Sequence, residues 1–196
     1  MKVLELFAGT RSIGKAFEER GHKVYSVEWC KDFENIDLYC DIGTLSAEDI
    51  LSKFGKPDII WASPDCTTYS IAAISHHRKK ESSGNLAPIS EYAKFCDSVN
   101  KNMLKLIAEL NPKYYFIENP RGGLRKMDFM QGIPKYTVTY CQYGDKREKP
   151  PCKPGSSCHI SAPRGSKTGT QGLKGSVERS RIPKELCDYI VYLCEK

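Results

Sequence analysis

The chain has 196 residues, with 30 basic and 24 acidic side chains that give a formal net charge of +6. This length suits one α/β domain with a full core, and 40% hydrophobic and 28% charged residues are ordinary for a globular protein. No apolar run approaches the roughly 18 residues of a membrane span, and the lysine-bearing N-terminus does not resemble a secretory signal. We therefore expect a cytoplasmic protein without membrane contact.

The cysteines indicate the redox state of the thiols, and the charge distribution indicates the kind of binding partner. Nine cysteines are an odd number, and without a secretory signal they indicate reduced thiols rather than a disulfide framework. Basic residues gather late in the chain, which favours a polyanionic partner.

The N-terminal segment predicts a cofactor-binding unit. Residues 3–7 are a short apolar strand, Gly9 lies in a turn, residues 12–19 have helical character, and a second strand at 23–27 ends at Glu28. A glycine turn lets a ligand approach free amides at a helix start, and an acidic residue about 20 positions later can bind ribose hydroxyls. The alternatives are a packing glycine and a solvated carboxylate.

Asp41 follows a possible third strand and could accept a hydrogen bond from an adenine amino group at the same sheet edge. The alternative is an aspartate in a turn or at a helix N-cap. A helix at 47–54 should then return the chain to the next strand.

Cys66 is the candidate nucleophile. The apolar run 58–62 predicts a buried strand, and Ser63-Pro64-Asp65 breaks it just before the cysteine. Ligands of open α/β sheets bind outside the carboxyl ends of the strands, where this thiol would lie. The alternative is a small buried hydrophobic residue at a strand end.

A polar, basic segment at 71–85 follows the cysteine. We interpret it as a mobile lid whose cations hold a phosphate backbone, and the alternative is a solvated loop. The candidate phosphate-binding residues are His76, His77, Arg78, Lys79 and Lys80.

Glu118 is the second catalytic candidate. Ser90 should cap a long helix that runs to Leu110, and residues 114–117 predict another buried strand leading into Glu118-Asn119-Pro120. A carboxyl group at that strand end could act as an acid or hydrogen-bond donor.

The last 47 residues carry less specific patterns. The spacing of Cys152, Cys158 and His159 is unlike that of zinc sites, so we predict no metal. Residues 161–184 are rich in Gly, Ser, Thr, Arg and Lys; this segment predicts a flexible loop placing Arg164 and Lys167 on phosphates, or a disordered solvated loop. A helix from Ile182 to Cys194 should close the chain, with Leu186, Ile190, Val191 and Leu193 facing inward.

Four blocks together resemble the cytosine-C5 DNA methyltransferases, which use S-adenosylmethionine. In chain order they are Leu6-Phe7-Ala8-Gly9-Thr10, Ser63-Pro64-Asp65-Cys66 with Tyr69-Ser70, Glu118-Asn119-Pro120, and Gln142 to Lys149. The resemblance covers roughly residues 1–149, and the reduced size is similar to members encoded by bacteriophages.

The resemblance implies a Rossmann-like α/β methyltransferase fold with a rudimentary recognition loop. The expected parts are a catalytic core at 1–149, a short basic recognition loop at 150–181, and a helix at 182–196 that packs back on the core. The expected setting is the cytoplasm of a bacterium or a phage-infected cell, with a monomer favoured.

The same resemblance implies roles for individual residues. Cys66 would add to C6 of a cytosine flipped out of duplex DNA, Glu118 would hold or protonate N3, and Arg147 would bind the carbonyl oxygen. The residues expected to bind S-adenosylmethionine are Phe7, Gly9, Thr10, Glu28, Trp29, Asp41, Ile42 and Pro64. Trp29 would stack on adenine or, alternatively, lie partly buried in the core.

The chain departs from the family pattern at several positions. Arg11 and Ser12 replace two glycines, Asp65 replaces a proline, Thr67 a glutamine, and Lys149 an arginine. Only some 30 residues stand in place of a larger recognition domain, which implies low or short-site specificity. The same chemistry on RNA or a free nucleotide, and an inactive nucleic-acid-binding remnant, are the alternatives.

Overall fold

The structure is a computed structural model that describes residues 1–82, 84–138, 140–143 and 175–196. Its centre is a parallel sheet in the order β3-β2-β1-β4-β7. The strands are β1 (Lys2–Leu6), β2 (Lys23–Glu28), β3 (Leu38–Tyr39), β4 (Ile59–Ala62) and β7 (Tyr114–Ile117). This is the strand order of doubly wound nucleotide-binding sheets, and it confirms the predicted Rossmann-like fold.

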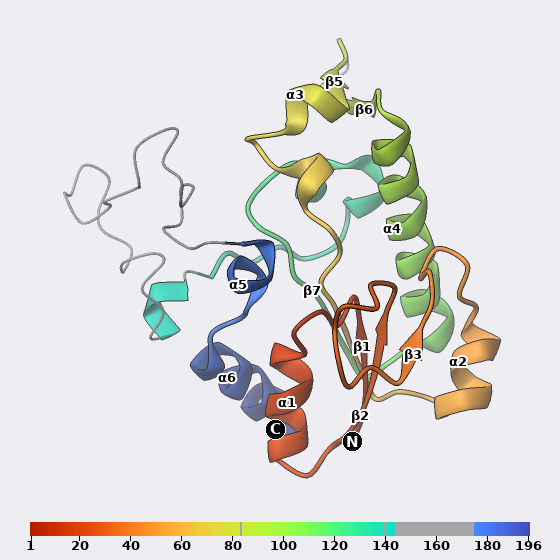
Figure 1. The fold of residues 1–196 in the computed structure, drawn as a ribbon, viewed down its shortest axis with the longest axis vertical. Helices are drawn as coiled ribbons and strands as arrows, with labels where there is room; N and C mark the ends of the chain where they lie inside the picture. Colours follow the sequence, from red (N-terminus) through yellow and green to blue (C-terminus); the bar gives the residue numbers. More distant parts are fainter. Residues whose placement is uncertain (83, 139, 144–174) are drawn as a thin grey trace.

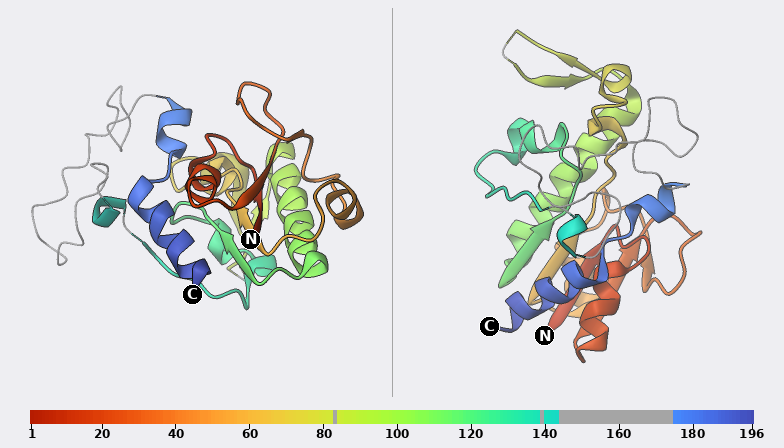
Figure 2. Two further views of the ribbon diagram at one scale, coloured as in Figure 1. Left: turned by 90° about the horizontal axis from the view of Figure 1, so that it is seen from below. Right: turned by 90° about the vertical axis from the view of Figure 1, so that its left-hand side faces the viewer.

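Helices cover both faces of the sheet (Figures 1 and 2). On one face α1 (Ser12–Glu19) and α6 (Lys184–Glu195) pack over Val3, Ile59 and Trp61. On the other face α2 (Ala47–Phe54) and α4 (Glu91–Leu110) pack over Leu4, Leu6 and Ile60. The alternation of these strand residues between faces follows from the period of two along a strand.

Local sequence signals explain where the helices begin and end. Ser46 and Asp49 form a capping box at the start of α2. At the start of α4, the Ser90 hydroxyl accepts a hydrogen bond from the Ala93 amide at 3.1 Å. The left-handed backbone of Asn111, with φ of 43°, ends α4.

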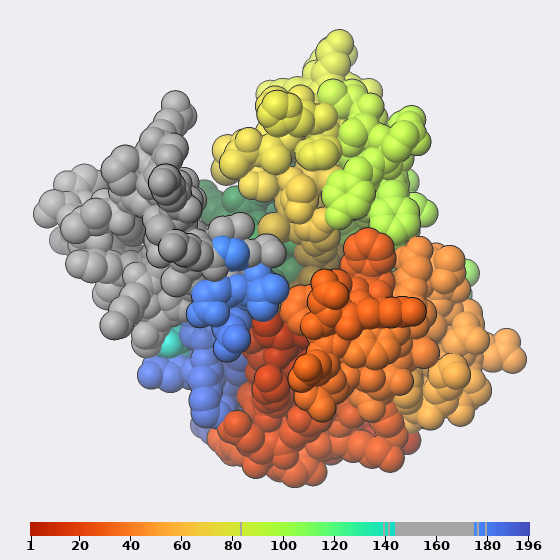
Figure 3. Space-filling model, viewed as in Figure 1, coloured from red at the N-terminus to blue at the C-terminus, as the bar shows by residue number. Residues whose placement is uncertain are grey.

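A smaller group of elements stands above the sheet, at the N-terminal end of α4 (Figures 1 and 3). The turn η1 (Thr67–Tyr69), the short helix α3 (Ile74–His77) and the antiparallel strands β5 (Arg78–Lys80) and β6 (Leu86–Pro88) build it. A third core cluster around Tyr69, Cys96 and Leu124 supports these elements. The segment that we expected to be a lid thus includes a short helix and a hairpin.

Short helical turns connect the remaining described parts. They are η2 (Leu124–Lys126), η3 (Asp128–Met130), η4 (Tyr140–Tyr143) and α5 (Ser176–Ser180). Within the described residues, no helix is both long and apolar enough to span a membrane.

Two details of the sequence prediction are wrong. β7 is not fully buried, because it pairs with β4 alone among the described strands and leaves Tyr115 exposed. In α6 the expected inward residue Leu193 is 39% exposed, and Cys187 and Cys194 are buried instead. Burial raises the pKa of these two thiols to about 12 and about 11, so both stay protonated at neutral pH.

Candidate active site

Within the part of the chain that the structure describes, the predicted catalytic and cofactor residues converge at one edge of the sheet. Because β1, β2, β4 and β7 are parallel, their carboxyl ends meet there. Backbone hydrogen bonds continue past the strand ends: the Ser63 amide donates to the Leu6 carbonyl at 3.2 Å, and the Glu118 amide donates to the Ala62 carbonyl at 2.8 Å. The cysteine turn therefore lies between the cofactor loop (residues 7–11) and the segment that begins at Glu118.

The cofactor loop has an unusual backbone. Phe7, Gly9 and Arg11 all have positive φ, at 55°, 49° and 55°. For a non-glycine residue the left-handed region costs about 1–2 kcal/mol, so side-chain contacts must compensate at Arg11. Its guanidinium is buried and donates to the Ser26 hydroxyl at 2.7 Å and to the Glu18 carboxylate. Arg11 thereby keeps a left-handed backbone at a position where the resemblance expects glycine.

Glu5 is a buried carboxyl group that sequence reasoning missed. It lies in the middle of β1, accepts hydrogen bonds from the Gly14 amide at 3.0 Å and the Ser26 hydroxyl at 3.2 Å, and lies 3.9 Å from Arg11. Burial is the main cause that raises its pKa to about 7. One feature of the sequence could have identified it: Glu5 is the one charged residue in the apolar run 3–7.

Glu28 binds the cofactor loop directly. One carboxylate oxygen accepts the Gly9 amide at 2.9 Å, and the other accepts the amides of Trp29 and Cys30 at 2.9 and 3.0 Å. Glu28 is only 5% exposed, so the alternative of a solvated carboxylate is wrong. A carboxylate has about four acceptor positions, so these three amides leave room for a ribose hydroxyl.

Trp29 and Asp41 flank this site. Trp29 is 65% exposed, which excludes the alternative of a core tryptophan and leaves its ring available for stacking. Asp41 accepts the Gly43 amide at 2.7 Å, so it does form the turn that we gave as its alternative role. Asn102 of α4 donates to the carbonyl oxygen of buried Ile42 at 2.7 Å and holds this loop against α4.

The turn that presents Cys66 is shaped by Asp65. Its carboxylate accepts the Thr67 amide at 2.8 Å and the Thr67 hydroxyl at 2.7 Å, and it also accepts the Tyr92 hydroxyl from α4. The resemblance expects proline and glutamine at these two positions. Asp65 and Thr67 instead form a hydrogen-bonded turn with each other. Cys66 itself is partly exposed, which does not fit the alternative of a buried hydrophobic residue.

Glu118 lies next to this turn and shares contacts with it. The Asn119 amide group donates to the Pro64 carbonyl at 2.8 Å, which joins the two predicted catalytic segments. The Tyr140 hydroxyl donates to a Glu118 carboxylate oxygen at 3.0 Å. Arg147, the third predicted catalytic residue, lies outside the described residues.

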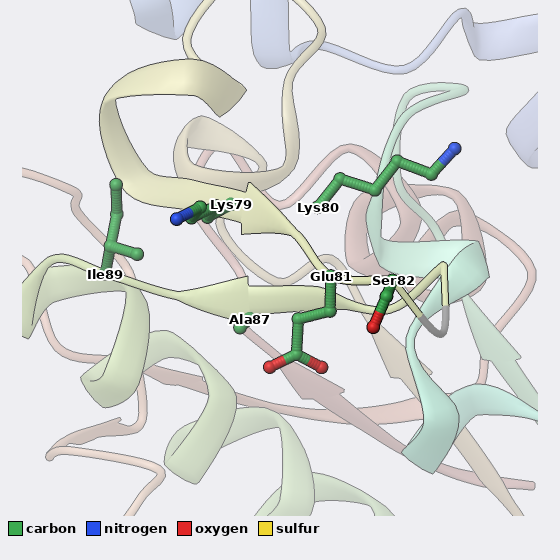
Figure 4. A pocket seen from close by; sticks show the side chains of 6 residues that line it. All are labelled: Lys79, Lys80, Glu81, Ser82, Ala87 and Ile89. Atoms are coloured by element: carbon green, nitrogen blue, oxygen red, sulfur yellow. The ribbon is translucent and has the colours of Figure 1, made fainter.

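The predicted phosphate-binding residues of the hairpin region differ in how exposed their side chains are. His76, Lys79 and Lys80 are exposed, and Lys80 extends from the hairpin on the side opposite Glu81 (Figure 4). His77 is partly buried and hydrogen-bonded to Ser90 at 2.9 Å.

Arg78 corrects the prediction of a phosphate-binding residue. Its side chain is fully buried and paired with Asp97, so its guanidinium is not presented to a ligand at the surface. Arg164 and Lys167 lie outside the described residues, as do Cys152, Cys158 and His159.

Comparison with known proteins decides the family. The family model described as C-5 cytosine-specific DNA methylase matches residues 1–131. The chain belongs to this family. The match includes the cofactor loop, the Cys66 turn and Glu118, and it agrees with the resemblance that the sequence blocks indicated.

The chain is also similar to individual proteins. A probable DNA (cytosine-5)-methyltransferase of Frog virus 3 (isolate Goorha) is 30% identical over 155 residues, which cover 74% of this chain and 65% of that protein. A mutant form of DNMT2 from Spodoptera frugiperda is 20% identical, with a TM-score of 0.40, over 62% of this chain and 36% of that structure. The chain thus spans about two thirds of the length of its viral relative.

Proposed function

We propose that this protein transfers a methyl group from S-adenosylmethionine to C5 of cytosine in DNA, with low or short-site specificity. The observation that carries the proposal is the joining of two catalytic segments, in which Asn119 binds the carbonyl of Pro64 beside Cys66 and directly follows Glu118. A thiol and a carboxyl group held on adjacent strand ends suit nucleophilic addition to a pyrimidine with assistance at the ring nitrogen.

The residues present fit S-adenosylmethionine. The left-handed turn at Gly9 places the cofactor loop against Glu28, Glu28 retains acceptor capacity, and the exposed Trp29 ring can stack on an adenine. Phe7 and Gly9 would lie beside the methionine part, Glu28 beside the ribose and Asp41 beside the adenine amino group. The remaining predicted cofactor residues are Thr10, Ile42 and Pro64. When bound, the cofactor supplies an electrophilic methyl group.

The chain's own groups then account for the bond changes at cytosine. The Cys66 thiolate forms a bond to C6, and the displaced ring electrons make C5 nucleophilic. Glu118 donates a hydrogen bond or proton at N3, and Arg147 binds the carbonyl oxygen that carries developing negative charge. After C5 gains the methyl group, the C5 proton leaves to water, a proton given to N3 returns to Glu118, and the Cys66–C6 bond breaks, which restores the thiolate and the aromatic ring.

DNA would reach the site across the hairpin. His76, His77, Lys79 and Lys80 would contact phosphates, while the base leaves the helix at a cost of a few kcal/mol. Arg164 and Lys167, in the proposed recognition loop at 150–181, would add phosphate contacts.

The inactive-remnant alternative rested on Arg11, Ser12 and Thr67. The side-chain contacts of Arg11 and Thr67 keep both turns in defined conformations, which favours the active enzyme.

Covalent trapping tests the proposal. A duplex containing 5-fluorocytosine is incubated with the protein and S-adenosylmethionine, because fluorine at C5 cannot leave as a cation and the adduct persists. We expect a denaturation-resistant adduct that maps to Cys66 and is absent in Cys66→Ala.

Cys194→Ala, which removes a buried thiol of α6 far from the turn, is the control and should still form the adduct. An adduct only on RNA or on a cytosine nucleotide would change the substrate. Retained 5-methylcytosine formation by Cys66→Ala would refute the mechanism.

A further inference from the structure

A buried polar cluster lies directly behind the cysteine turn, and we call it the Arg78 hub. The Arg78 guanidinium donates to both carboxylate oxygens of Asp97, at 2.7 and 3.1 Å. It also donates to the backbone carbonyl and the hydroxyl of Thr68, at 3.0 and 3.1 Å. A bidentate pair of this kind fixes the orientation of the two groups as well as their distance. Arg78 therefore holds β5 against both η1 and α4.

Tyr69 is the centre of the Arg78 hub. The Arg78 guanidinium lies over its ring, 4.1 Å from the ring centre. Its hydroxyl donates to Asp97 at 2.7 Å and accepts from the Asn100 amide group at 2.8 Å. Burial, together with the bond to Asp97, raises the pKa of Tyr69, so the hydroxyl remains a donor at all ordinary pH values.

The backbone of Tyr69 connects this cluster to the segment that carries Glu118. The Gly123 amide donates to the Tyr69 carbonyl at 2.7 Å. A Cβ atom would lie 2.6 Å from the Tyr69 carbonyl oxygen if placed on Gly122, and 3.2 Å if placed on Gly123. The backbone at Gly122 therefore lies too close to the Tyr69 carbonyl for any residue except glycine. A side chain at position 123 would make a tight contact with the same carbonyl.

Two hydrogen bonds consequently bracket Cys66 and join its turn to the residues that follow Glu118. Pro64 and Tyr69 lie on either side of Cys66, and they bind Asn119 and Gly123, which follow Glu118. With both ends of the Cys66 turn joined in this way, the separation of the thiol and the carboxyl group depends on where η1 lies. The Arg78 hub holds η1 in place, because Arg78 binds Thr68 and lies over the ring of Tyr69.

We propose that Tyr69, Arg78 and Asp97 are positioning residues that set the placement of Cys66 relative to Glu118. Since Arg78 begins β5, the same contacts join the hairpin bearing Lys79 and Lys80 to the nucleophile turn. Hairpin and nucleophile therefore act as one body when DNA binds. This inference rests on the proposed methyl transfer and adds residues that do not touch the substrate.

Tyr69→Phe is the mildest test, because it removes only the hydroxyl from the Arg78 hub. We expect kcat for DNA methylation to fall about tenfold or more, since small displacements of reacting groups are costly. The KM for S-adenosylmethionine should stay within about twofold of the wild-type value, because no hydrogen bond joins the hub to residues 7–11 in the part of the chain described. The proposal is overturned if Tyr69→Phe keeps the wild-type kcat. It is also overturned if the KM for S-adenosylmethionine rises by the same factor by which kcat falls.

Substitutions at Arg78 separate charge from packing. Arg78→Lys keeps a cation opposite Asp97, whereas Arg78→Met keeps only the length of the side chain. We expect kcat to decrease in the order wild type, Arg78→Lys, Arg78→Met. Val191→Ala, which opens a cavity in buried α6, serves as a control for general destabilisation and should retain kcat at temperatures where it is folded. If Val191→Ala loses as much activity as Arg78→Lys, the role of Arg78 is purely structural.

Hydrogen exchange gives a readout that does not depend on methylation. In Tyr69→Phe the Gly123 amide should exchange about tenfold faster, while the Gly9 amide bound to Glu28 should be unchanged. If the wild-type protein forms no covalent adduct with any cytosine substrate, the proposed function fails. The exchange of Gly123 then still decides whether the Arg78 hub holds the two segments together, and an unchanged rate would refute it.

Discussion

The carboxyl group of Glu5 makes the stability of this fold depend on pH in an unusual direction. Most carboxylates in folded proteins are ionised and stabilise the native state at neutral pH. Glu5 instead has a pKa raised from its ordinary 4.5 to about 7, because burial opposes its charge more than Gly14, Arg11 and Ser26 support it. Replacing it by glutamine removes the titration and keeps a similar shape.

The sign and size of the effect follow from the two pKa values. The folded state binds the Glu5 proton more tightly than the unfolded state. The protonated carboxyl group therefore contributes fully to the free energy of unfolding below pH 4.5, and this contribution is lost as pH rises to about 7. At about 1.4 kcal/mol for each pH unit, the loss amounts to about 3 kcal/mol. The wild-type protein should therefore lose about 3 kcal/mol relative to Glu5→Gln between pH 4.5 and pH 8.

Urea unfolding at several pH values measures this difference. The free energy of unfolding of wild type minus that of Glu5→Gln should fall through pH 5 to 7 and become constant above pH 8. Exchange of the exposed carboxylate Glu34 for glutamine is the matched control and should give no such slope. A difference that stays constant, or that rises with pH, would show that burial does not raise the pKa of Glu5 and would refute the assignment.

Two further substitutions test the packing around the site. Gly14→Ala would place a Cβ atom 2.3 Å from a Glu5 carboxylate oxygen, so overpacking of about 1–3 kcal/mol should outweigh the gain of about 1 kcal/mol in helix propensity. Urea unfolding should show a net loss for Gly14→Ala, and a smaller loss when Glu5→Ala is made in the same chain. Asn119→Ala removes the donor to Pro64, so we expect single-turnover methylation to slow about 10–100-fold while stability falls by only about 1 kcal/mol. A methylation rate like that of wild type would show that this tie does not position Cys66.

The sequence was sufficient for the order of the sheet strands and of the four helices that cover them. The apolar runs, the serine at the start of α4 and the glycine turn after β1 each act through nearest neighbours, so their consequences can be worked out locally. The positions of Cys66 and Glu118 at strand ends followed for the same reason, since a parallel sheet brings its carboxyl ends together.

Only the tertiary structure decided which charged residues face solvent. Arg78 belongs to a basic run, and nothing local distinguishes it from Lys79 and Lys80. Its burial depends on Asp97, 19 positions away, and on Tyr69, and these residues meet only after α4 has packed beside the cysteine turn. A buried charge is tolerated where a partner compensates its loss of hydration, and partners that are distant in sequence are chosen by the fold.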